Sequence, residues 1–151
     1  MIKVQHQDFN VAALYENLCD NNQTGAVAMF VGRVRDFSEH NNSNLDTRFE
    51  LEHYPGMTEH NLQQIVDEAH KRWDLHQVHV IHRVGELKIQ DQIVFVGVSS
   101  SHRAEAFLAC DFVMDYLKSR AAFWKKETQS GNSQWVSAKE TDEKSLERWS
   151  K

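Results

Sequence analysis

Two lysines with aromatic residues between them are the first candidates for chemistry. Lys118 and Lys125 are seven positions apart, so a helix that continued through both would bring them to nearly the same face, two turns from each other. Apolar bulk lies between them in the segment 121–124, Ala-Ala-Phe-Trp. Desolvation and mutual repulsion would then make one amine a nucleophile or base near neutral pH. The alternative is a solvated helix end, where cations suit the helix dipole.

Two further groups of basic side chains stand where a predicted element ends or begins. Arg33 and Arg35 close an apolar run that has the composition of a strand. His102 and Arg103 follow the serine-rich end of another apolar run, at the predicted start of a helix, where free backbone N–H groups and the helix dipole favour an anion. Both groups are compatible with a bound phosphate or carboxylate, and equally with an ordinary helix cap and a charged strand end.

The histidines and cysteines do not form a metal-binding pattern. His76, His79 and His82 occur at three-residue intervals, but in a strand the side chains of His79 and His82 point to opposite faces. We therefore expect no metal site and interpret these histidines as surface or edge residues. Cys19 and Cys110 lie far apart on two predicted helices with no CxxC spacing, which predicts buried free thiols.

Hydrophobic periodicity predicts the elements that must position these side chains. The predicted helices run from Val11 to Leu18 after a cap at Asp8 or Asn10, from Thr58 to near Asp74, from Arg103 to about Lys118, and from Thr141 to Trp149. The predicted strands cover Gly25 to Arg35, Arg48 to Tyr54, Gln77 to Val84, Gln92 to Ser100, and a final strand at Trp135 and Val136.

Some residues within these elements have specific expected places. Gly32 predicts a bulge or a close approach of another backbone. Thr58 and Ser101 are expected to cap their helices. The Asn- and Ser-rich segment 36–47 is expected to be a mobile loop. The inner stripe of the longest helix is predicted to contain Phe107, Cys110, Met114 and Leu117.

Length and charge limit the class of protein. The chain has 151 residues, which predicts one domain over 1–151. Seventeen Lys and Arg against 22 Asp and Glu give a net charge of −5, which disfavours a generic nucleic-acid binder. The sequence has neither a signal-peptide pattern nor an apolar run long enough to span a bilayer, so we expect a cytoplasmic protein.

Several strings, in order and covering most of the chain from Gly25 to Glu140, closely resemble one enzyme family. They are GAVAMFVGRVRD, LEHYPGMTE, IVDEAHKRW, VIHRVGEL, IVFVGVSSSHRAEAF, FVMDYLKSRAAFWKKE and WVSAKE. The family is the large, catalytic subunit of molybdopterin synthase. The resemblance implies an α+β fold with an α/β-hammerhead core, and a heterotetramer in which a dimer of large subunits carries a small ubiquitin-like sulfur carrier at each end.

The resemblance also implies a reaction and its residues. The family is a sulfurtransferase that converts cyclic pyranopterin monophosphate to molybdopterin, with sulfur delivered as a thiocarboxylate on the carrier's C-terminal glycine, and it needs no metal or other cofactor. The family's two catalytic lysines fall on Lys118 and Lys125. Its substrate-binding positions fall on Arg33, Val34, Arg35, His102, Arg103, Lys126 and Glu127.

The chain departs from the family pattern outside these positions. Ala122 replaces the proline that many members carry before the Phe-Trp-Lys string, and Lys88-Ile89 replaces a tryptophan-proline pair. None of the assigned site residues is changed by these departures, which concern the local backbone geometry before Lys125 and the sequence after the Gly-Glu-Leu string.

Two other functional classes remain open from the residues alone. A non-catalytic anion- or nucleotide-binding module would keep the arginines and have no need of the lysine pair; turnover separates it from an enzyme. A structural partner of a ubiquitin-like protein would bind the carrier's tail and not the pterin, and a pterin-binding titration separates it from a synthase.

Overall fold

Two four-stranded sheets form the framework of the computed structural model, which describes residues 1–36, 48–129, 132–136 and 140–150. The first sheet has the order β1 (Ile2–Gln5), β4 (Gln77–Arg83), β6 (Gln92–Ser100), β2 (Ala26–Arg33), with only β1 and β4 parallel. The second is antiparallel, in the order β5 (Gly85–Leu87), β3 (Arg48–His53), β7 (Phe123–Gln129), β8 (Asn132–Val136). The predicted loop 36–47 lies, apart from Asp36, outside the described residues.

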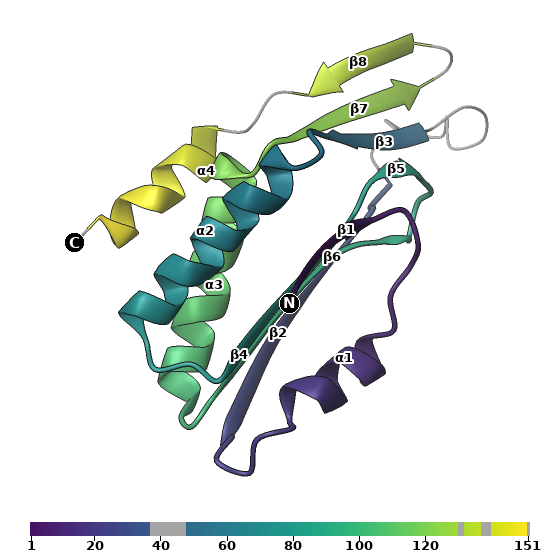
Figure 1. Cartoon of the computed structure of the whole chain (residues 1–151). Coiled ribbons are helices and arrows are strands. Elements are labelled where there is room, and N and C mark those ends of the chain that lie inside the picture. Colours follow the sequence, from purple (N-terminus) through teal and green to yellow (C-terminus); the bar gives the residue numbers. More distant parts are fainter. Residues whose placement is uncertain (37–47, 130–131, 137–139, 151) are drawn as a thin grey trace.

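Helices cover both faces of the first sheet. The short helix α1 (Val11–Leu18) packs on one face, whereas α2 (Met57–Arg72) and α3 (Arg103–Arg120) pack on the other, and β3, β7 and β8 extend beyond one end of the sheet (Figure 1). The chain closes with α4 (Glu140–Ser145) and a 3₁₀ turn, η1 (Leu146–Trp149). The α+β prediction is confirmed. No helix in the described ranges combines the length and apolarity of a membrane span.

The central strand β6 is buried on both faces, as its continuous apolar run predicts. Val94, Val96 and Val98 pack with α2 and α3, while Phe95 packs with the residues of α1 on the opposite face. Gly97 allows this packing, because a Cβ there would lie 2.5 Å from a methyl carbon of Leu18.

The bulge predicted at Gly32 is confirmed. The register between β2 and β6 shifts between Gly32 and Arg33, and a Cβ on Gly32 would lie 2.8 Å from Cγ1 of Val94. Since a bulge redirects the side chains that follow it, this irregularity sets the direction in which the chain leaves β2 at Arg33.

The predicted helix from Arg103 to about Lys118 agrees with α3, and the helix does not continue to Lys125. The helix α3 ends at Arg120, Ala121 has extended backbone angles (φ −76°, ψ 140°), and the chain turns into β7. Strand pairing overrides the helical pattern here, because β7 forms ladders with both β3 and β8. The predicted strands also do not include β1, β5 and β7, which have four, three and seven residues.

The helix starts agree only in part with the predicted caps. The Asn10 side chain accepts a hydrogen bond from the Ala13 N–H at 3.1 Å and caps α1 as expected. Thr58 does not cap α2, whose N-cap is Gly56 in the left-handed region at φ 87°. The bend at Pro55-Gly56 starts the helix two residues earlier than the sequence pattern indicates. Thr58 is instead a buried residue of the first turn.

Two further details of the sequence prediction need correction. Ser101 is not the cap of α3, because His102 takes the N-cap position without a side-chain cap bond. Phe107 is 66% exposed, so the buried face of α3 is rotated away from it and includes Cys110 and Leu117. Cys110 is the buried free thiol that was predicted, whereas Cys19, at the end of α1, is exposed.

The last turn anchors the C-terminal segment to α3. Trp149 packs edge-on against Trp73 and Phe112, and its Nε1 donates to Oδ2 of Asp115 at 2.6 Å. Arg148 pairs with the same carboxylate at 2.6 Å. These contacts hold α4 and η1 beside the last turns of α3, the part of the helix that carries Lys118.

Candidate active site

The two predicted catalytic lysines come from different elements but from the same end of the molecule. Lys118 lies exposed in the last turn of α3. Lys125 lies on β7, with Nζ 5.7 Å from the centroid of the Phe49 ring and 3.8 Å from Oε1 of Glu127. The helix end and the strand therefore supply one lysine each, instead of one helix supplying both.

Strand pairing determines which side chains of β7 face the first sheet. Lys125 pairs with Leu51 and Glu127 pairs with Phe49, and directly paired side chains lie on one face of a sheet. Because Phe49 and Leu51 are buried, Lys125 and Glu127 share the inner face. Lys126 points to the other face, with Nζ 5.7 Å from the Trp135 ring centroid.

A buried histidine lies close to the lysines. His82, on β4, is 5% exposed and stacks on Phe123 with 3.8 Å between ring centroids and 18° between planes. Burial, assisted by the nearby charges of Lys118 and His53, lowers the pKa of His82 from 6.5 to about 4, although its bond to a backbone carbonyl opposes the shift. The ring is therefore neutral at pH 7.

The acceptor partner of His82 fixes its tautomer. Nδ1 lies 2.8 Å from the carbonyl oxygen of Arg83, which only accepts, so Nδ1 carries the proton and Nε2 is the acceptor nitrogen. Interpreting His82 as a surface or edge histidine was wrong, and the same holds for His79, which is 4% exposed. The position of His82 inside an apolar strand, VIHRV, was the signal that it is buried.

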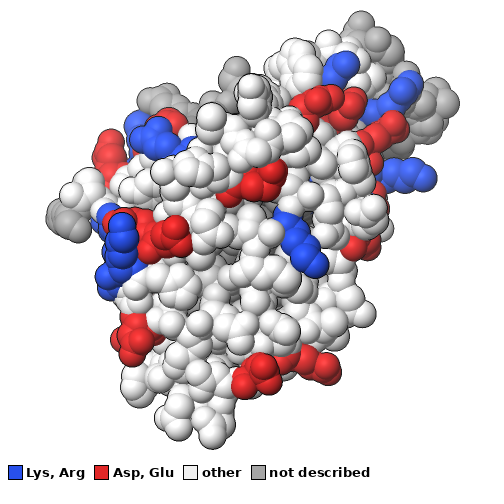
Figure 2. Space-filling view, viewed as in Figure 1, with Lys and Arg blue, Asp and Glu red and all other residues white. Residues whose placement is uncertain are grey.

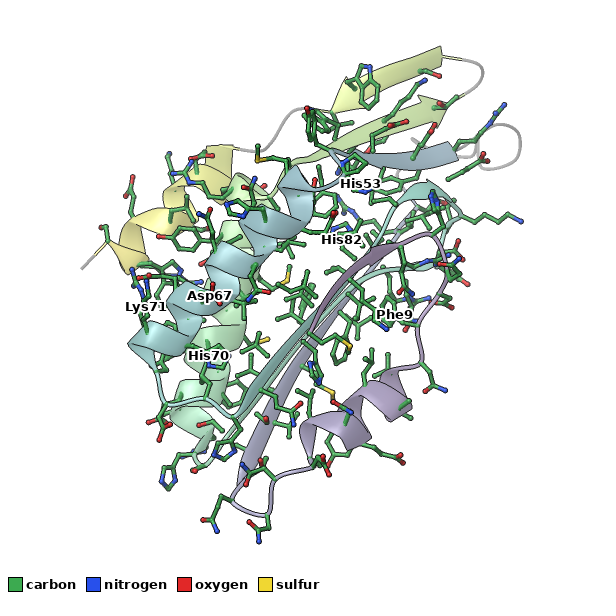
Figure 3. The ribbon with its side chains drawn as sticks, in the orientation of Figure 1. Phe9, His53, Asp67, His70, Lys71 and His82 are labelled. Carbon is green, nitrogen blue, oxygen red and sulfur yellow. The ribbon has the colours of Figure 1, made fainter. Side chains whose placement is uncertain are left out.

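A histidine–carboxylate pair completes this corner of the site. Nε2 of His53 is 3.7 Å from Oε1 of Glu59, and Oε2 of Glu59 accepts a hydrogen bond from the Gly56 N–H at 2.7 Å. His53 pairs with Phe123 across the second sheet. Figure 3 shows His53 and His82 in the region between α2 and the strands that cross above it. Neither His53 nor Glu59 was predicted from the sequence to lie at this site.

The arginine segment reaches the same end of the first sheet. Val34 is buried in the cluster that contains Phe49, the ring beneath Lys125. Its N–H donates to Asp91 O at 2.9 Å, and its carbonyl accepts from Gln90 N at 2.7 Å. Val34 thus places the exposed side chains on either side of it, those of Arg33 and Arg35.

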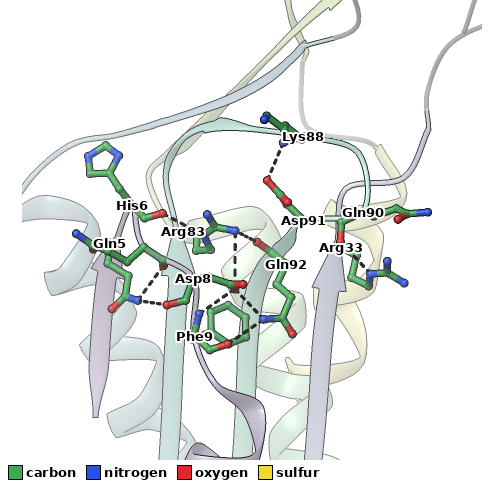
Figure 4. A network of polar contacts seen from close by, with 11 residues as sticks. Gln5, His6, Asp8, Phe9, Arg33, Arg83, Lys88, Gln90, Asp91 and Gln92 are labelled. Carbon is green, nitrogen blue, oxygen red and sulfur yellow. Dashed lines mark hydrogen bonds and ion pairs between the residues drawn. The ribbon is translucent and has the colours of Figure 1, made fainter. Parts of the chain in front are cut away.

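A network of polar contacts stabilises the sheet end beside Arg33 (Figure 4). Nη1 of Arg83 donates to Gln92 O at 3.0 Å and lies 3.8 Å from Oδ1 of Asp8. The same carboxylate oxygen accepts from Gln92 Nε2 at 2.8 Å. Nε of Arg33 donates to Gln90 O at 3.2 Å, at the edge of this network. The arginine segment therefore follows a sheet end that these hydrogen bonds and the ion pair stabilise.

His102 and Arg103 lie away from the lysines of the same chain. They are exposed at the start of α3, whereas Lys118 is 15 residues further along the helix. At a rise of about 1.5 Å per residue, this separates Arg103 from Lys118 by about 22 Å along the axis. One chain therefore joins Arg33, Val34, Arg35, Lys118, Lys125 and Glu127 at one end and leaves His102 and Arg103 at the other.

The remaining candidates for binding are separate. Among the described residues, no three His, Cys, Asp or Glu side chains are grouped as a metal site would need. His79 faces α1, opposite His82 as the strand period predicts, and its Nε2 lies 2.8 Å from Oδ1 of Asn17. Acidic and basic side chains are interspersed on the face shown in Figure 2.

The cationic side chain of Lys125 lies against a buried apolar surface. Lys125 lies over an aromatic ring, and the buried side of this corner consists of apolar residues and a neutral imidazole. Ammonium groups in such a place stabilise negative charge that develops on a bound substrate and exchange protons with it.

Solved structures with this fold define the class. A molybdopterin biosynthesis MoaE protein from Burkholderia ambifaria MC40-6 superposes with a TM-score of 0.83 at 47% identity, over 99% of this chain and 98% of that one. A complex of subunits 1 and 2 of molybdopterin-converting factor from Helicobacter pylori 26695 shares the fold at 19% identity, with a TM-score of 0.73 and 92% and 90% of the two chains covered. The Burkholderia match therefore places the chain in the class of MoaE proteins, and the Helicobacter match shows the same fold.

The sequence comparisons identify the family. The family model described as MoaE protein matches residues 4–120. The molybdopterin synthase catalytic subunit of Vibrio cholerae serotype O1 is 51% identical over 148 residues, which are 98% of this chain and 97% of that protein. The chain belongs to the MoaE protein family, and the family prediction made from the motifs is confirmed.

Proposed function

We propose that this chain is the catalytic subunit of a molybdopterin synthase, which converts cyclic pyranopterin monophosphate to molybdopterin. The observation that carries the proposal is a lysine pair placed with an arginine segment at one end of a fold whose relatives are named molybdopterin synthase catalytic subunit. The two dithiolene sulfurs arrive as thiocarboxylates, and the reaction takes place in the cytoplasm.

The lysines handle protons and the spent carrier. A thiocarboxylate is already a good nucleophile, so the enzyme must move protons, remove water and release the carrier. Lys118 is nearest the carrier's C-terminus as an acid/base or transient acceptor of its acyl group. Lys125, held by Glu127 at 3.8 Å, protonates leaving oxygens and binds the anion. This chemistry requires no metal or nucleotide.

The cations at the sheet end hold the substrate's phosphate. Arg33 and Arg35 flank the buried Val34 and are exposed, so their guanidinium groups can stabilise negative charge on a bound substrate. Lys126, on the outer face of β7, contributes to binding at the rim of the site.

A second copy of the chain supplies His102 and Arg103. Their separation of about 22 Å from Lys118 along α3 prevents them from joining the lysines of their own chain. Exposed apolar residues lie on the sheet-edge strand β2 and near the start of α3, and they suit a homodimer interface. These residues are Met29, Phe30, Phe107 and Leu108, with 43%, 42%, 66% and 44% exposure.

The second partner is a small ubiquitin-like sulfur carrier. The Helicobacter pylori structure with the same fold is a complex of two different subunits, which supports such a partner here. An extended C-terminal tail reaching Lys118 would bind along a groove through its backbone. Two carriers on a dimer of large subunits give a heterotetramer.

Turnover by the reconstituted complex tests the proposal. The wild-type chain, thiocarboxylated carrier and cyclic pyranopterin monophosphate should together yield the dithiolene product, whereas the carrier with its ordinary carboxylate should yield none. Binding of the pterin without turnover would instead support a non-catalytic anion-binding module. Binding of the carrier without the pterin would support a purely structural partner.

A further inference from the structure

A two-residue junction separates the elements that carry the lysines. The helix α3 ends at Arg120 and β7 begins at Phe123, so the chain changes direction through Ala121 and Ala122. The position of Lys125 relative to Lys118 therefore depends on how this short junction is held. Whatever fixes it also fixes the spacing of the two amines.

A buried hydroxyl holds the first part of the junction. Thr58, in the first turn of α2, is 0% exposed, and its Oγ1 lies 3.0 Å from the Tyr54 nitrogen and 2.7 Å from the Ala122 carbonyl oxygen. The nitrogen only donates and the carbonyl only accepts, so the hydroxyl accepts from Tyr54 and donates to Ala122. One atom thus ties the end of β3 and the start of α2 to the junction.

A buried ring holds the second part. His82 stacks on Phe123 at 3.8 Å between ring centroids, and its Nδ1 is anchored on the Arg83 carbonyl at 2.8 Å. Phe123 precedes Lys125 by two residues and shares its face of β7. The strand β4, which carries His82, therefore supports the start of β7 through this stacked ring.

The junction itself has little intrinsic rigidity. A proline at position 122 would fix φ near −65°, whereas this chain has alanine there. Alanine leaves that angle free, so the chain loses more backbone entropy when the junction orders. In this chain, the order must come from contacts with neighbouring elements.

We propose that Thr58 and His82 are positioning residues for the lysine pair, which fix the Ala122–Phe123 junction and thereby the placement of Lys125 relative to Lys118. This inference rests on the proposed function, because that function gives the lysines their role. Neither residue touches the reacting atoms; each acts through the backbone or ring of the junction.

Thr58→Val tests the hydroxyl, because valine keeps the shape and removes both hydrogen bonds. We expect kcat for dithiolene formation to fall about 10- to 100-fold, the scale of a misplaced catalytic group, while KM for the carrier stays within about twofold. Thr58→Ser should retain most of kcat. The matched control is Thr24→Val, which removes a threonine hydroxyl bonded to His76 at the opposite end of the first sheet.

Rescue separates positioning from a general loss of stability. Ala122→Pro should restore most of kcat to Thr58→Val, since Ala121 already has the extended angles that the residue before proline prefers. If Thr58→Val folds and has wild-type kcat, the hydroxyl is not a positioning group. If its loss of kcat follows its loss of thermal stability and the proline does not restore it, the role is only structural.

His82 gives a second, independent pair of variants. His82→Phe keeps a ring against Phe123 and should retain most of kcat, whereas His82→Ala removes the ring and should lower kcat by at least about tenfold. Equal kcat values for folded Phe and Ala variants would overturn the proposal for His82.

Hydrogen exchange distinguishes failure of this inference from failure of the proposed function. The amides of residues 122–126 should exchange faster in Thr58→Val and recover in the variant that also carries Ala122→Pro, whether or not the wild-type chain makes product. A wild-type chain without turnover but with this exchange pattern would contradict the function and leave the bracing intact. Unchanged exchange in Thr58→Val would contradict the bracing itself.

Discussion

Lys118 is exposed beside the buried Leu117, so its side chain matters more for chemistry than for packing. We expect Lys118→Ala to keep the free energy of unfolding within about 0.5 kcal/mol of wild type, as is usual for exposed positions. Product formation should fall by about 10²- to 10⁴-fold, the contribution of a positioned acid or base. Urea unfolding and the dithiolene assay measure the two effects. Near-wild-type turnover would remove Lys118 from the mechanism.

The buried imidazole of His82 predicts a loss of stability in acid. Burial lowers its pKa from 6.5 to about 4, so between these values the unfolded chain binds more protons than the folded chain. The free energy of unfolding should therefore fall as pH decreases through this window, by about 3 kcal/mol from His82 between pH 7 and pH 4.

Urea titrations over this pH range measure the effect, with His82→Phe as the comparison. Burial also lowers the pKa of His79, which adds a decline of the same sign to both proteins. The phenylalanine variant should lose the His82 contribution, so its stability should depend less steeply on pH. Equal slopes for the two proteins would mean that His82 titrates normally.

At the scale of elements, the C-terminal turn braces the helix that carries Lys118. Trp149 is 7% exposed and packs against Trp73 and Phe112. Trp149→Ala should lower the free energy of unfolding by about 3–5 kcal/mol, the usual cost of emptying an aromatic site in a core. Trp135→Ala, at a 58% exposed position, is the control and should change stability by less than about 1 kcal/mol. Similar losses for both would contradict this assignment.

The sequence predicted the long elements well and the short ones poorly. The apolar runs of β2, β4 and β6 and the stripe of α2 have enough residues for their periods to be clear. The strand β7, FWKKETQ, has no clear hydrophobic period. Its conformation depends on pairing with β3, which is remote in sequence, and with β8, which is equally polar. The predicted helix therefore ends correctly near Lys118, but the residues after it were assigned to no strand.

At the scale of the whole molecule, spacing in sequence is a poor guide to which site residues meet. The motifs located Lys118, Lys125 and Arg35, and the fold brings their elements to one end. The same motifs included His102 and Arg103, which the length of α3 places at the other end. His82 and Thr58 were missed as parts of this corner, because their contacts with the α3–β7 junction depend on tertiary packing.

Complementation between two inactive variants tests most directly whether two copies of this chain build one active site. Arg35→Ala and Arg103→Ala should each bind substrate weakly, with a defect that shrinks as salt screens the wild-type charge pairing. In a mixed dimer, one site carries both substitutions and the other carries neither.

Random exchange should therefore restore about a quarter of the wild-type product formation, since half of the dimers are mixed and each has one intact site. Native mass spectrometry confirms the exchange, and the dithiolene product is the readout. If two copies build each site, product formation should recover toward that level. Confirmed mixed dimers with no recovered activity would contradict it and would place every essential side chain within one chain.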